Sequence, residues 1–149
     1  MPTHLSVFSL LVTVAVALPI QTAGARQPET IKLQGNLLKL EFFGPPNYGE
    51  SPKTDRREQA LVLQLPATAK AQGVLCKESG AELCTALTEA TFIQLAPPMQ
   101  QSKRYASLVG RKVQIEGVPF LAESGHHRTK VMLQPKSIGS IEAWAWQAK

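Results

Sequence analysis

Two short polar segments contain the residues of this chain that are best suited to bind or to react. The first segment, Phe43–Glu58, reads FGPPNYGESPKTDRRE and places Asn47, Tyr48 and Glu50 directly after two adjacent prolines. Proline restricts the backbone, and an aromatic ring on a rigid support loses little side-chain entropy on binding. Connections of about 16 residues are long for a hairpin and are often functional. We therefore predict that this segment contacts a ligand or a partner.

The second segment, Ala122–Thr129, reads AESGHHRT and supplies two imidazoles. Imidazole is a ligand for zinc and copper. Adjacent residues of an extended chain point to opposite faces, however, so His126 and His127 share one metal only if the backbone turns sharply. Acidic residues complete a ligand set only if the two segments converge, and the candidates are Glu50, Asp55 and Glu123. Three roles stay open for this segment: a metal site, a hydrogen-bonding or pH-sensing loop, and a structural turn.

Catalysis has little support in the residue pattern. The chain contains no G-x-S-x-G motif and no phosphate-binding glycine loop. Ser124 lies two residues before His126, but no orienting acid can be assigned to the pair. We predict a protein that is not an enzyme, with no catalytic residue, no cofactor and no metal in its principal function.

Alternating apolar residues predict a mostly β chain. The expected strands are Ile31–Phe43, Leu61–Leu65, Thr91–Leu95, Lys112–Gly117 and Lys130–Leu133. In the first strand the apolar phase slips by one residue near Gly35, which predicts a β-bulge or a coil there.

Two further segments have helical character. Gln101–Leu108 predicts one short helix that turns Tyr105 and Leu108 inward and ends at Gly110 in a left-handed conformation. A second short helix at Ala81–Ala90 competes with a hairpin, and the residues do not decide between them.

This order of elements predicts a small five-stranded OB-like barrel. OB-folds bind through the face of strands 2 and 3 and through the loops that join strands 1–2 and 4–5. Those two loops would be the two polar segments described above, which are far apart in the sequence. We expect them to converge on one side of the barrel.

The first 25 residues predict the compartment. Leu5–Ile20 is an uncharged apolar run, and Ala23-Gly24-Ala25 follows it just before Arg26. This pattern is typical of a signal peptide, here 1–25, cleaved after Ala25 and followed by one domain, 26–149. The rival reading is an uncleaved anchor, but the run is shorter than the roughly 20 residues that span a bilayer. We predict a periplasmic or secreted protein without a transmembrane segment in its mature chain.

An oxidising compartment favours a disulfide between Cys76 and Cys84. The formal net charge of +5 lies outside the leader, since residues 1–25 contain no Lys, Arg, Asp or Glu. The basic residues are scattered rather than blocked, so binding to nucleic acid is the weakest of the functional hypotheses. Oligomeric state cannot be read from these features.

Three stretches resemble an uncharacterised family of small secreted bacterial domains. They are FFGPPNYGESPKTD, YASLVGRKVQIEG and SGHHRTKVML, and the resemblance runs from about Gly35 to Ile138. The family pattern has a third histidine where this chain has Arg128, and a glycine followed directly by lysine where it has Arg111. A three-imidazole metal site, if the family has one, would lack a ligand here, and the resemblance implies no activity.

These observations together predict a non-catalytic binding module that engages an envelope protein or a toxin. The predicted contact residues are Asn47, Tyr48, Glu50, His126, His127, Arg128 and Thr129. The alternative is a periplasmic metal-binding or small-ligand-binding protein that uses the loop with His126 and His127.

Overall fold

The computed structural model describes residues 29–74 and 80–141. In order, their elements are β1 (Ile31–Phe43), β2 (Arg57–Gln64), η1 (Lys70–Gln72), α1 (Ala81–Glu89), β3 (Phe92–Leu95), η2 (Met99–Gln101), α2 (Ser102–Ala106), β4 (Lys112–Leu121) and β5 (Val131–Ser140). The predicted leader, Cys76 and the tryptophans of the tail lie outside the described residues. Signal cleavage and the Cys76–Cys84 disulfide therefore stay predictions.

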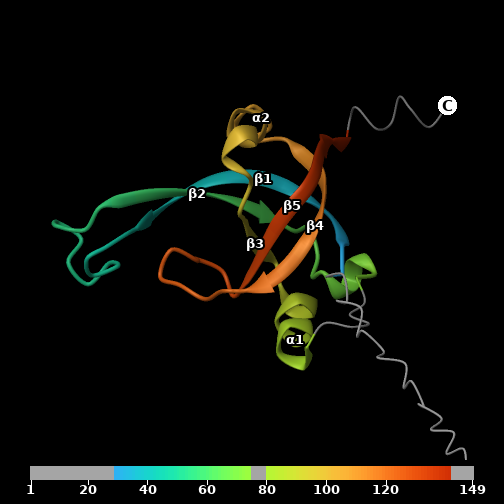
Figure 1. The fold of residues 1–149 in the computed structure, drawn as a ribbon, viewed down its shortest axis with the longest axis horizontal. Helices are drawn as coiled ribbons and strands as arrows, with labels where there is room; N and C mark the ends of the chain where they lie inside the picture. The colour runs from blue at the N-terminus through green and yellow to red at the C-terminus, as the bar shows by residue number, and fades with distance from the viewer. Residues whose placement is uncertain (1–28, 75–79, 142–149) are drawn as a thin grey trace, which may run out of the picture.

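Five strands pair in the order β1-β2-β3-β5-β4 and close into a barrel through β1 and β4 (Figure 1). Neighbouring strands run antiparallel except β3 and β5, which run parallel. The predicted mostly β architecture with five strands is confirmed. The far halves of β1 and β2 extend beyond the barrel as a two-stranded arm that ends in the long β1–β2 loop (Figure 1).

The prediction of one short helix was too low, because the described residues contain two α-helices and two short 3-10 helices. The helix α2 lies where it was expected, and Gly110 follows it with φ of 82°. The second helix, α1, forms at the segment that left helix and hairpin open. Its sequence, AELCTALTE, is rich in good helix formers, and Leu87 is buried in the core. None of the helices in the described ranges is long and apolar enough to cross a membrane.

Side chains from every strand fill the barrel interior. Leu33, Leu37, Ile93, Ile115 and Leu133 have no exposed surface. Tyr105 of α2 is also fully buried in this core, and Leu108 packs against it, as the sequence predicts. Burial of such residues is the main stabilising contribution to the fold.

The bulge predicted near Gly35 is absent from the described β1. The register of β1 is unbroken against both β4 and β2. The apolar phase changes because Leu38, Leu40 and Phe42 point to the opposite side of the sheet from Leu37. β1 therefore carries apolar residues on both faces. Leu37 belongs to the interior core, and Leu38, Leu40 and Phe42 lie on the opposite face.

The outer face of the barrel carries a row of five paired residues, one from each strand. Leu38 pairs with Val62, Val62 with Gln94, Gln94 with Met132, and Met132 with Phe120. Directly paired residues project to the same side of a sheet. Val62 and Met132 are each only 1% exposed, although both are outside the interior core cluster. Another part of the molecule must therefore cover this row.

Both β4 and β5 are longer than their predicted ranges. The register shifts between Glu116 and Gly117, where the predicted strand ended, and pairing then continues to Leu121. A Cβ atom at Gly117 would lie 2.5 Å from the carbonyl oxygen of Gln134, so the close approach requires glycine. In the sequence, Gly117 therefore has the pattern of a strand end, although the strand continues beyond it.

Candidate functional site

The β1–β2 loop (44–56) and the β4–β5 loop (122–130) lie side by side, as contacts between them show. A Cβ atom on Gly125 would lie 2.9 Å from the ring and from the hydroxyl of Tyr48. Arg128 lies over the same ring, with Cζ 5.2 Å from its centroid. We call these two loops, with Phe42, Phe43, Arg57 and Glu58 that flank the first, the two-loop surface. The expected convergence of the two segments is thus present in the structure (Figure 1).

Asp55 organises the backbone of the β1–β2 loop. Its carboxylate accepts hydrogen bonds from the backbone N–H groups of Asn47 at 3.0 Å, Gly49 at 2.8 Å and Ser51 at 3.3 Å. Between the first two donors, Tyr48 has φ of 52°, which is uncommon for a residue with a side chain. Such conformations persist where surrounding contacts enforce them, and they occur often at functional sites.

The same three hydrogen bonds make the loop sensitive to acid. Burial of Asp55 raises its pKa, but the hydrogen bonds from Gly49, Asn47 and Ser51 together outweigh burial, so its pKa lies below the usual value. The ionised Asp55 carboxylate therefore stabilises the folded protein fully above the unfolded-state pKa, which is about 3.9. This contribution is lost as pH falls through the lower folded-state pKa.

We expect Asp55→Asn to lower the midpoint of urea unfolding at pH 7, because an amide nitrogen then faces backbone donors. The difference from wild type should shrink below about pH 4, where the carboxylate becomes protonated. Urea titrations between pH 2 and pH 7 measure this, with Glu50→Gln as the control, since Glu50 is an exposed acid of the same loop. A difference that stays constant over this range would contradict the assignment.

Tyr48 is presented by the loop rather than buried in it. Its side chain is 45% exposed, and its backbone N–H donates to the carbonyl of Gly44 at 3.0 Å. Arg128 supports the ring from the second loop and is also 5.9 Å from the ring of Phe42. A guanidinium over an aromatic face is attracted by the ring quadrupole. The second loop therefore holds the ring, while nearly half of the side chain stays accessible.

Glu58, at the second position of β2, ties the β4–β5 loop to the arm. Its Oε2 accepts from the Arg128 guanidinium at 2.8 Å and lies 3.2 Å from Nδ1 of His126. The hydrogen bond with His126 lowers the pKa of Glu58, partial burial acts in the opposite direction, and the bond from Arg128 lowers it further. Sequence reasoning missed Glu58 as a site residue, because it joins residues that lie about 70 positions away.

Gln94 of β3 holds the backbone of the β4–β5 loop. Its Nε2 donates to the carbonyl of His126 at 3.2 Å, and its Oε1 accepts from the N–H of Arg128 at 2.6 Å. Gln94 lies at the middle of the outer row and is 8% exposed. The loop that Gln94 binds therefore lies over this row, which explains why Val62 and Met132 are buried. Sequence reasoning missed this residue too.

Thr129 and His127 support the β4–β5 loop from within. The Thr129 hydroxyl accepts from the Gln94 N–H at 2.9 Å and donates to the Val131 carbonyl at 2.6 Å, so it bridges β3 and the start of β5. Nδ1 of His127 accepts from the N–H of Glu123 at 2.8 Å, which places the ring proton on Nε2. Both predicted contact residues are thus structural parts of the loop.

Of the predicted contact residues, the structure brings Tyr48, His126 and Arg128 together. Asn47 contributes its backbone N–H to Asp55, and Glu50 is exposed on the β1–β2 loop. Within the described ranges, no group of three or more His, Cys, Asp or Glu residues is placed to hold a metal ion. Asp55, one of the acids considered for such a site, uses both oxygens for backbone N–H groups.

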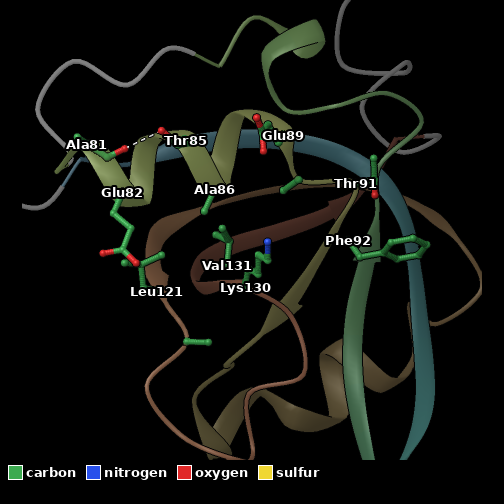
Figure 2. Close-up of a pocket in the computed structure, with 12 residues that line it drawn as sticks. Ala81, Glu82, Thr85, Ala86, Glu89, Thr91, Phe92, Leu121, Lys130 and Val131 are labelled. Carbon is green, nitrogen blue, oxygen red and sulfur yellow. Dashed lines mark hydrogen bonds between the residues drawn. The ribbon is translucent and has the colours of Figure 1, made fainter.

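A cavity of about 920 Å³ lies between α1 and the adjoining ends of β3, β4 and β5 (Figure 2). Side chains of α1, including the acids Glu82 and Glu89, line one side, and Phe92, Leu121 and Val131 contribute from the strands. None of the predicted contact residues lines it. The cavity reaches the two-loop surface at Ala122 and Lys130, the first and last residues of the β4–β5 loop.

One family model matches the chain. It describes a domain of unknown function, DUF4431, and matches residues 92–138. The matched segment runs from the start of β3 into β5 and so includes Gln94 and the whole β4–β5 loop. It supports a relationship to an uncharacterised family over this part of the chain. No curated protein matches the sequence.

Proposed function

We propose that this protein is a secreted or periplasmic, non-catalytic binding module of OB-like architecture. It engages another protein of the bacterial envelope, an enzyme or a toxin, through the two-loop surface. The observation that carries the proposal is the placement of Tyr48, whose strained backbone is held by Asp55 and whose half-exposed ring is supported by Arg128.

The strand order supports the OB-like assignment. A five-stranded closed barrel ordered β1-β2-β3-β5-β4, with β3 and β5 parallel, has the pairing expected of that fold. OB-folds use the loops between strands 1–2 and 4–5 for recognition, and here these loops touch. Fold alone does not imply function, so the argument depends on the residues of the loops.

The shape of the site favours a protein over a small molecule. Small ligands bind in concave sites that enclose most of their surface. Tyr48 instead lies against the β4–β5 loop with 45% of its side chain exposed, and the 920 Å³ cavity lies at α1. An aromatic residue on a fixed backbone is a typical anchor of protein interfaces.

Both histidines make contacts that hold the β4–β5 loop. Nδ1 of His127 is used by the backbone of its own loop, and Nδ1 of His126 faces Glu58. The sequence alternative, a metal or small-ligand site at these histidines, lacks a clustered ligand set among the described residues. Including a chelator in the binding experiments separates the two functions.

The test uses a photo-crosslinking amino acid at position 48 of the protein, expressed in its own periplasm. The control position is Met99, which is 89% exposed and lies in η2, next to α2. We expect an adduct of one defined mass from position 48, with and without chelator, and none of that mass from position 99. The partner recovered from the adduct should then bind Tyr48→Ala about 30-fold more weakly, as for an interface hot spot of about 2 kcal/mol.

Thermal unfolding provides the control for Tyr48→Ala. An exposed ring contributes little to stability, so the transition should stay close to that of wild type. Adducts of equal mass from both positions, or no adduct from position 48, would contradict the proposed site. Unfolding of Tyr48→Ala would show that the ring is structural.

A further inference from the structure

Three acidic residues of the arm and its loop are engaged within the molecule. Asp55 accepts backbone N–H groups, and Glu58 pairs with Arg128 and His126. Glu41 lies 3.5 Å from Arg57. Among acids of the β1–β2 loop and its flanks, this leaves Glu50 exposed and without an ion pair to any residue that the structure describes.

The basic residues of the same region point outward. Lys53 and Arg56 are exposed, and neither has an ion-pair partner among the residues that the structure describes. Arg57 is half exposed, and its guanidinium is 3.7 Å from the centroid of the Phe43 ring. A stacked guanidinium is pre-oriented and keeps its N–H donors in its plane, where they match a carboxylate.

The stacked arginine is continuous with the Tyr48 site. A Cβ atom on Gly49 would lie 3.4 Å from the ring of Phe43, so the ring that supports Arg57 packs beneath the residue next to Tyr48. The tip of the arm thus combines a half-exposed aromatic ring with two exposed cations, Lys53 and Arg56, and with Arg57, which also pairs with Glu41. Complementary charge on a partner speeds association and selects among partners.

We propose that the two-loop surface recognises an acidic segment of its partner protein, with Lys53, Arg56 and Arg57 as contacts for carboxylates. This rests on the proposed function and adds the chemistry of the partner. The carboxylate of Glu41 is a weak, exposed partner of Arg57, and a carboxylate of the bound protein replaces or joins it.

A location-specific charge reversal tests this. The probe is a fluorescent deca-glutamate peptide, measured by anisotropy in about 20 mM salt and in physiological salt of about 150 mM. The test variant is Lys53→Glu with Arg56→Glu. The matched control is Lys103→Glu with Arg111→Glu, which changes net charge equally at exposed positions in α2 and just before β4, away from the arm (Figure 1).

We expect the arm variant to bind the peptide at least about tenfold more weakly, and the control variant less than about threefold, because unlike charges attract most at short range. Wild-type binding should weaken in the higher salt. Equal loss in the two variants, or no binding by wild type in low salt, would overturn the inference. Tighter binding of an oligo-dT of equal charge would assign the surface to nucleic acid instead.

The two proposals fail in distinguishable ways. A specific adduct at position 48 together with unchanged peptide binding by the arm variant would reject the acidic partner and keep the binding site. A location-specific charge effect without an adduct at position 48 would reject the protein-binding site and keep the preference for carboxylates.

Discussion

Gln94→Leu should release the β4–β5 loop from the barrel and with it the partner. The substitution removes both hydrogen bonds that the side chain makes to the loop backbone, at His126 and at Arg128. An intramolecular hydrogen bond contributes about 1 kcal/mol, so the loss of two favours loop opening by about 2 kcal/mol, or roughly 30-fold. If only the closed loop binds, affinity falls to the extent that the open loop becomes populated, because the apparent Kd is the intrinsic Kd divided by the closed fraction.

Amide hydrogen exchange measures the opening directly. The N–H of Arg128, which donates to Gln94 in the wild type, should exchange roughly 30-fold faster in Gln94→Leu. The core amides should stay protected, since a leucine fits between the apolar neighbours Val62 and Met132. The free energy of global unfolding should therefore fall by no more than the free energy of loop opening does.

Gln114→Leu is the matched control for this substitution. The side chain of Gln114 in β4 accepts a hydrogen bond from Gln34 at 3.0 Å on the exposed surface, and so bonds to β1 rather than to the loop. It should leave exchange at Arg128 unchanged. If Gln94→Leu also leaves that exchange unchanged, Gln94 does not hold the loop, and the loop is positioned by Glu58 or by its own hydrogen bonds.

Gly35→Ala should lower the free energy of unfolding by about 2–3 kcal/mol, as overpacking of a close contact does. At this point β1 passes from pairing with β4 to pairing with β2, and Asn36 pairs with both Lys112 and Gln64. A Cβ atom on Gly35 would lie well inside van der Waals contact with the carbonyl oxygen of Gln64. The backbone of β2 would have to move, since a carbonyl oxygen cannot rotate away as a side chain can.

Urea unfolding of Gly35→Ala and of a second glycine variant tests this. Gly80 has φ of −54°, and a Cβ atom there would meet nothing within 4 Å. Gly80→Ala should therefore change the free energy of unfolding by less than about 1 kcal/mol. Equal effects at the two positions would indicate that chain entropy, rather than the strand crossing, sets the cost.

Local patterns in the sequence determined much of the secondary structure. The alternation in Ile31–Phe43 predicts β1 with the bounds that the structure has, and the prolines and glycines after it predict the β1–β2 loop. These features succeed because they depend on the conformations open to each residue and on the side-chain period of a strand. They say nothing about which strand lies beside which.

The same local patterns misplaced one feature of β1. The change of apolar phase at Leu37 and Leu38 was interpreted as a bulge, but the strand is regular and its second apolar set lies on the outer face. The spacing of apolar residues indicates which side of the strand each of them occupies. It cannot report that a loop from another part of the chain will cover that side.

By itself, the sequence determined the strands, the two polar loops and the candidates Tyr48, His126 and Arg128. Only the tertiary structure decided that Glu58 and Gln94 join those loops, and that Thr129 and His127 support one loop from within. The physical reason is that the contacts of Glu58, Gln94 and Thr129 between different elements depend on strand register, whereas the contact of His127 depends on the turn of its own loop. A single glutamine in β3 reaches the β4–β5 loop only because β3 pairs with β5 at Met132.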